Sequence, residues 1–169
     1  HRVFGDPWPD VSDEALLARA EEWLDLDALA AGRGSDATSG LRGLLGWRES
    51  ARLDEVVPET ITVPSGSRIR IDYPEPGSDT SPVLAVKLQE CFGWADGPTV
   101  CDGRVRVVLH LLSPARRPLA VTDDLASFWA SVYPAVRVEN RGRYSKHPWP
   151  EDPMTATPTK RTNRALRGN

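Results

Sequence analysis

The chain has 169 residues, of which 40% are hydrophobic, and a formal net charge of −3. This length and composition allow one main domain with a sizeable core, and no apolar run reaches the length of a membrane span. No signal-peptide pattern is present, so we expect a cytoplasmic protein without a membrane span. The two cysteines form neither a disulfide framework nor a zinc-binding pattern. Because the first residue is His1, we interpret the chain as a piece of a longer protein.

Charge is unevenly distributed along the chain. Residues 1–60 carry 6 Lys/Arg and 13 Asp/Glu, residues 61–136 carry 7 and 8, and residues 137–169 carry 8 and 3. A basic end on an acidic body can bind nucleic acid or dock on an acidic protein surface. Composition alone leaves both interpretations open.

Residues 1–55 are predicted to be a helical lead-in to the main domain. Ser12 is a suitable N-cap, and Asp13 and Glu14 follow in the first turn, where the helix dipole favours anions. Apolar residues then recur at a spacing of three to four, which makes one apolar helix face. Gly32 is the expected C-terminal stop, and a second helical stretch follows around residues 41–47.

Residues 56–145 are predicted to form an α+β domain in the order β-β-α-β-β-α. The alternating runs 60–63 and 67–73 flank the turn at 64–66 and indicate a first hairpin. A second hairpin is expected around Asp102-Gly103, the strongest short-range hairpin signal. Between the hairpins, residues 81–93 are predicted to be a helix, with Ser81 as cap and Gly93 as stop.

A last helix is predicted from its cap at Thr122 to a stop at Gly142, with a kink or restart at Pro134. This order indicates an antiparallel sheet of two β-hairpins with helices on one face. Residues 146–169 are predicted to be an extended proline-rich basic tail. Its prolines exclude both a helix interior and a central strand, so it must lie against another surface.

Catalytic patterns are absent from the sequence. The glycine-rich stretch 32–46 lacks the Gly-Lys-Ser/Thr ending of a phosphate-binding loop, and no Gly-x-Ser-x-Gly elbow is present. We therefore predict no catalytic residue, no metal site and no cofactor within this chain.

The basic C-terminal segment carries the functional signal. Its cations can bind phosphates, and its aromatic residues can stack on unpaired bases, each stack contributing about 1–3 kcal/mol. The candidate nucleic-acid-binding residues are Arg137, Arg141, Arg143, Tyr144, Lys146, His147, Trp149, Lys160 and Arg161. In the alternative interpretation, Trp149 simply fills a groove on its own domain, because it is flanked by two prolines.

Several stretches of the sequence closely resemble a known family. They are 88–93, 110–115, Arg117-Pro118, Asp124-Leu125, 127–129, 141–144, 146–153 and 156–159. Together they resemble the C-terminal domain of the HrpB-type ATP-dependent RNA helicases of bacteria, a DEAH-like family. The resemblance implies that the parent protein hydrolyses ATP with magnesium in a core that is absent from this chain, to which residues 1–55 would be the link. No ATPase residue is carried over.

Two functions remain open at this point. The chain is expected to be an accessory domain that helps a helicase bind or position RNA or another single-stranded nucleic acid. Alternatively, it is a structural or protein-interaction module that docks on its own helicase core or on a protein partner.

Overall fold

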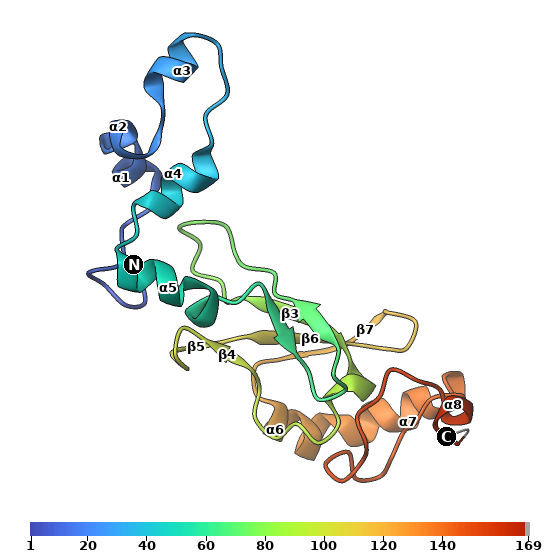
Figure 1. Cartoon of the computed structure of the whole chain (residues 1–169). Helices are drawn as coiled ribbons and strands as arrows, with labels where there is room; N and C mark the ends of the chain where they lie inside the picture. The colour runs from blue at the N-terminus through green and yellow to red at the C-terminus, as the bar shows by residue number, and fades with distance from the viewer. Residues whose placement is uncertain (168–169) are drawn as a thin grey trace. The chain divides into compact units, whose positions relative to one another are not determined.

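The computed structural model describes residues 1–167, which divide into two compact units. The first unit comprises His1–Val57 and Glu75–Asp79, and the second comprises Pro58–Pro74 and the chain from Thr80 onward. Helices and small sheets are both present, which confirms the predicted α+β class (Figure 1). None of the helices among the described residues combines the length and apolarity needed to cross a membrane.

The first unit is built from five short helices, as its helical pattern predicts. They are α1 (Asp13–Ala18), α2 (Ala20–Trp23), α3 (Leu26–Ala30), α4 (Ala37–Gly43) and α5 (Trp47–Val56). Ser12 is the N-cap of α1, because its side chain accepts a hydrogen bond from the Ala15 N–H. Asp25 and Asp36 cap α3 and α4 in the same way. Helices α2 and α4 pack closely, since a Cβ on Gly40 would overlap the Trp23 carbonyl oxygen.

Among the described residues of the second unit, seven short strands form three separate sheets. They are β1 (Thr60–Thr62), β2 (Arg68–Arg70), β3 (Val83–Lys87), β4 (Thr99–Val100), β5 (Val105–Arg106), β6 (Val108–Leu112) and β7 (Pro118–Thr122). Strands β1 and β2 form one antiparallel ribbon, and β4 and β5 form another. The main sheet has the order β3-β6-β7, in which β3 and β6 are parallel and β6 and β7 are antiparallel.

The helix predicted over residues 81–93 is wrong. Residues 83–87 form strand β3, in which Leu84 and Val86 are buried and the intervening Ala85 is exposed. This period of two belongs to a strand, and the β-branched residues favour it. Only the next four residues are helical, as the 3₁₀ turn η1 (Leu88–Cys91).

The antiparallel sheet of two hairpins is also wrong. Both predicted hairpin turns are present, but each joins only a two-stranded ribbon. The second run does not continue as one strand, because Val107 separates β5 from β6 and β6 pairs in parallel with β3. The intervening residues 88–107 supply the crossover that a parallel pair needs. Strand β7 was not predicted.

The cap of the final helical region lies two residues later than the predicted cap, Thr122. Helix α6 (Leu125–Ser127) is capped by Asp124, while the Thr122 hydroxyl accepts a hydrogen bond from the Asp124 N–H. The π-helical turn η2 (Phe128–Val132) follows, and α7 (Tyr133–Arg143) begins with Pro134 in its first turn. The predicted restart at Pro134 is therefore confirmed. The last described helix is α8 (Asn163–Arg167).

An aromatic cluster lies at the centre of the second unit. Phe92, Phe128, Trp129 and Tyr133 are all buried, and their rings meet at centroid distances of 5.0 to 6.5 Å, mostly edge to face. The Trp129 Nε1–H donates to the Trp94 carbonyl oxygen at 2.8 Å. Buried aliphatic residues of β3 and β6 complete the same core.

Candidate nucleic-acid interface

The segment that follows α7 lies against the core as an ordered strap, defined here as residues 144–161. Tyr133 and Arg137, one turn apart on α7, both contact it. The Tyr133 hydroxyl donates to the Pro150 carbonyl oxygen at 2.8 Å, and the Arg137 Nε donates to the Trp149 carbonyl oxygen at 2.9 Å. Arg137 also forms a 3.2 Å ion pair with Glu151. The proline-rich strap forms no regular β-ladder, so its carbonyl oxygens need other donors. Two side chains of α7 supply these hydrogen bonds.

Backbone hydrogen bonds attach the strap to η1 itself and to Gly93, which follows it closely. The Gly93 N–H donates to the Pro153 carbonyl oxygen at 3.0 Å, and the Thr159 N–H donates to the Gln89 carbonyl oxygen at 2.8 Å. Thr159 is buried, although it lies in a polar segment near the end of the chain. These bonds fix the backbone on both sides of residues 154–158. Figure 1 shows this segment, in dark red, looping beside α7.

Trp149 is the central anchor of the strap. Its side chain is 9% exposed and belongs to the hydrophobic core, and its Nε1–H donates to the Tyr144 carbonyl oxygen at 3.3 Å. Tyr144 is itself half-buried against the core. Trp149 would have to leave the core before it could stack on a base. Its placement supports the packing role that the sequence left open.

The other predicted residues divide by exposure. Five cations have exposed side chains: Arg141, Arg143, Lys146, Lys160 and Arg161. Within the described residues, none of these five forms a salt bridge. Arg137 differs from them, because its side chain is 20% exposed and contacts the strap. The sequence offered no basis for dividing the predicted cations into groups. The structure shows that Arg137 anchors the strap, whereas the other five cations are available to bind a ligand.

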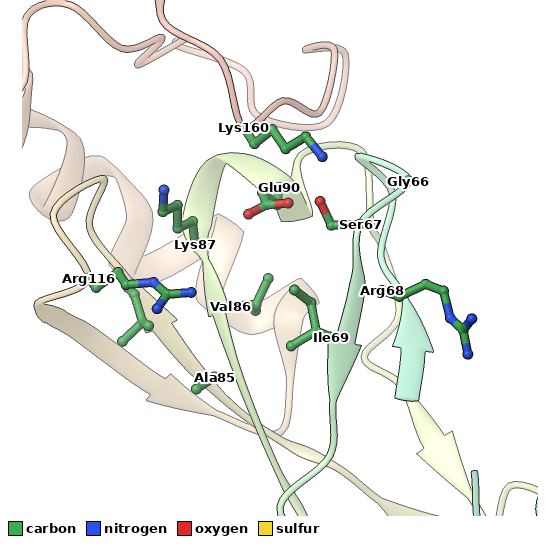
Figure 2. A pocket seen from close by; sticks show the side chains of 11 residues that line it. Gly66, Ser67, Arg68, Ile69, Ala85, Val86, Lys87, Glu90, Arg116 and Lys160 are labelled. Carbon is green, nitrogen blue, oxygen red and sulfur yellow. The ribbon is translucent and has the colours of Figure 1, made fainter. Parts of the chain in front are cut away.

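A cationic pocket lies at the edge of the second unit, with a volume of about 700 Å³. Its charged lining residues are Arg68, Lys87, Glu90, Arg116 and Lys160, and its apolar lining includes Ile69, Val86 and Leu112. Figure 2 shows Lys87, Arg116 and Lys160 around Glu90, whereas Arg68 turns away from them. Arg68 donates to the Thr60 hydroxyl at 3.0 Å.

Local backbone geometry places two of these cations. Arg116 lies in the turn between β6 and β7 with φ of 61°, a left-handed conformation that costs a non-glycine residue about 1–2 kcal/mol. The buried Ser113 supports this turn, since its hydroxyl accepts from the Arg117 N–H at 3.0 Å and its carbonyl oxygen accepts from the Arg116 N–H at 2.8 Å. Lys160 directly follows the anchored Thr159, so the strap carries it to the pocket.

Glu90 is buried at the same pocket and has a structural partner. Its carboxylate accepts from the Ser65 hydroxyl at 2.6 Å, and its carbonyl oxygen accepts from the Ser65 N–H at 3.2 Å. This pair attaches the β1–β2 turn to η1. Because the Ser65 donors are neutral, Glu90 keeps its negative charge and offsets part of the positive charge of the surrounding cations.

The imidazole of His147 is affected by the charge of Lys87, one of the pocket cations. Burial lowers the pKa of this half-buried imidazole, and the charge of Lys87 lowers it further. The charge of Lys87 therefore reaches the strap. Among the described residues, no group of three or more His, Cys, Asp or Glu side chains could hold a metal ion.

The sequence prediction identified Lys160 but missed Lys87, Arg116, Arg68 and Glu90. These residues come from separate segments, and the sequence around most of them contains no motif that indicates binding. The exception is Arg116, which follows the Ser113-Pro114 turn at the end of a strongly apolar strand. Loops carried by a rigid scaffold often hold binding residues, so this turn could have indicated Arg116.

Comparisons with known proteins identify the family to which this chain belongs. Residues 20–153 match the family model described as ATP-dependent helicase C-terminal, so the chain belongs to this family. The chain is 49% identical over 162 residues to the ATP-dependent RNA helicase HrpB of Escherichia coli strain K12, covering 93% of this chain and 20% of that protein.

Solved structures give the same result. The crystal structure of the E. coli DExH-box NTPase HrpB matches with a TM-score of 0.80 and 48% identity, over 92% of this chain and 19% of that one. The crystal structure of the Escherichia coli DEAH/RHA helicase HrpB matches with a TM-score of 0.64 and 46% identity, over 84% and 18%. The chain thus spans about a fifth of the length of these relatives, and it is the C-terminal domain of an ATP-dependent helicase.

Proposed function

We propose that this domain is a non-catalytic accessory module that helps an ATP-dependent RNA helicase bind and position single-stranded RNA. The observation that carries the proposal is the set of exposed cations on the end of α7 and on the anchored strap, which form no salt bridge with any other described residue. Cations that a fold holds in place bind a phosphate backbone with less loss of side-chain freedom than cations of a flexible tail. The proposal includes a cytoplasmic location, and ATP and magnesium would bind to parts of the helicase outside this chain.

A binding titration tests this proposal. The anisotropy of a short fluorescein-labelled oligouridylate should rise as the 169-residue chain is added, and the affinity should fall steeply between about 50 and 200 mM salt. The variant Arg141→Ala/Arg143→Ala should bind more weakly. The matched control, Arg33→Ala/Arg48→Ala, removes two exposed arginines of the first unit and should change the affinity less. Absence of binding by the unmodified chain at low salt would refute the proposal.

A second candidate function, docking on a protein surface, is favoured by the first unit. Trp47 is 85% exposed and Leu17 is 77% exposed, and large apolar side chains that are this open often mark protein contacts. The partner in this case would be the remaining part of the helicase. Replacement of both residues by serine should weaken association with that part, measured by calorimetry, without reducing the affinity for RNA. Unchanged association would exclude this surface.

A further inference from the structure

The cationic pocket brings together like charges from distant parts of the second unit. Lys87 ends β3, Arg116 lies in the β6–β7 turn, and Lys160 lies in the strap. Among the described residues, none of the three forms an ion pair. The three cations outnumber the single Glu90 carboxylate in the pocket, so the pocket keeps a net positive charge that attracts an anion.

The apolar residues that line the pocket indicate which class of anion it can bind. Ile69, Ala85 and Leu112 give an apolar surface beside the three cations. A volume of about 700 Å³ lies in the range of small-molecule sites, which combine apolar walls with a few polar groups. A nucleotide matches this lining, because it carries a charged phosphate next to a flat base whose faces are apolar.

The backbone that carries two of the three cations is held in place before any ligand arrives. The left-handed conformation at Arg116 is fixed by the hydrogen bonds of its turn to Ser113, and the backbone that precedes Lys160 is fixed by the hydrogen bond between Thr159 and Gln89. A strained residue that the surrounding fold enforces beside a pocket points to a binding role. Preorganised groups also lose less conformational freedom on binding.

We propose that this pocket binds the phosphate group of one nucleotide unit, with Lys87, Arg116 and Lys160 as its ligands and with the base against the apolar surface. Arg116 is the ligand suited to a two-pronged contact, since its guanidinium presents parallel N–H donors to phosphate oxygens. The inference deepens and rests on the proposed RNA-binding function where the nucleotide is part of an RNA strand. A free nucleotide carries the same chemistry from a second source.

A charge-matched pair of variants tests the pocket. Lys87→Ala/Arg116→Ala removes two pocket cations, and the control Arg104→Ala/Arg106→Ala removes two arginines near the β4–β5 ribbon that do not line the pocket. Binding of the labelled oligouridylate should weaken about tenfold or more in the pocket variant and clearly less in the control. The slope of log affinity against log salt should become shallower by about 1.4 in the pocket variant.

A second variant and a free nucleotide complete the experiment. Lys160→Glu reverses one charge on an exposed strap residue, so it tests the pocket without disturbing the core, and thermal melting checks the fold of every variant. Uridine 5′-monophosphate is titrated against each chain while the ring-proton resonance of His147 is followed.

The outcomes separate this inference from the proposed function. Weaker oligouridylate binding in both pocket variants supports a site for an RNA strand. Loss of the monophosphate-induced His147 shift, with strand binding unchanged or absent, supports a site for a free nucleotide. If neither ligand distinguishes the pocket variants from the control, the pocket inference is overturned, and the broader function then depends on the Arg141 and Arg143 titration alone.

Discussion

Two tryptophans show how differently the two units of the molecule are stabilised. Trp47 begins α5 in the first unit and is 85% exposed, whereas Trp149 lies in the strap of the second unit and is 9% exposed. The first unit relies on caps and turns between residues close in sequence, such as Asp25 with Ala28. The strap relies on contacts with residues far away in sequence, such as Thr159 with Gln89. Burial is therefore set by the surface that a segment meets, and a proline-rich segment can be better anchored than a helix.

The largest expected effect sharpens this comparison directly. Trp149→Ala should lower the free energy of unfolding by about 3–5 kcal/mol, because it removes a buried aromatic side chain and its hydrogen bond to Tyr144. Trp47→Ala should change it by less than about 0.5 kcal/mol. Urea unfolding followed by circular dichroism measures both. Equal losses in the two variants would contradict the distinction between the segments.

Alkaline pH should weaken the second unit through Tyr133. Burial raises the pKa of Tyr133 to about 12 from its usual value of 10, so the folded state resists losing this proton. Unfolding releases the proton, and stability is therefore full below about pH 10 and declines as the pH rises toward 12. One such group gives a slope of about 1.4 kcal/mol for each pH unit. Unfolding free energies of Tyr133→Phe, measured from pH 9 to 12, should lack this contribution.

A smaller effect separates anchors from available cations on α7. Arg137→Ala removes the hydrogen bond to the Trp149 carbonyl oxygen and the ion pair with Glu151, and should cost about 1–2 kcal/mol of stability. Its affinity for oligouridylate should be nearly unchanged. Arg141→Ala should behave in the opposite way, because Arg141 is exposed. The distinction fails if both variants lose the same stability and the same affinity.

The smallest effect concerns His147, which should titrate differently once its charged neighbour is removed. Because the charge of Lys87 contributes to the lowered pKa of His147, Lys87→Ala should raise that pKa, and Arg33→Ala should leave it unchanged. An NMR titration of the His147 ring protons measures the shift. An unchanged value in Lys87→Ala would show that Lys87 does not act on the strap.

Local signals in the sequence were sufficient for several caps and turns and for the fold class, although the caps predicted at Ser81 and Thr122 were wrong. Ser12, the Asp102-Gly103 turn and Pro134 each act through their own backbone preferences, so their neighbours in the sequence determine the outcome. The strand at residues 83–87 was missed for a different reason. Leu84 and Leu88 are spaced as on one helix face, while Leu84 and Val86 alternate as in a strand. Parallel pairing with β6 decides between these periods, and a single sequence does not display that partner.

The candidate interface was only partly predictable for the same physical reason. The strap cations are close together in sequence, so composition alone identified them. The cationic pocket requires Lys87, Arg116 and Lys160 to converge, and their convergence depends on the unpredicted strands β3 and β7. Composition also could not distinguish Arg137, which anchors the strap, from Arg141, which is free to bind a ligand.

The anchoring of the strap also has a consequence during protein synthesis. Residues 58–143 leave the ribosome before the strap does, and they carry Phe92, Trp129 and Tyr133, which share a core with Trp149. Until Trp149 and Thr159 have been translated, this aromatic cluster lacks part of its cover, and incompletely covered apolar surfaces promote aggregation. Docking of the strap then completes the core and delivers Lys160 to the cationic pocket in the same step.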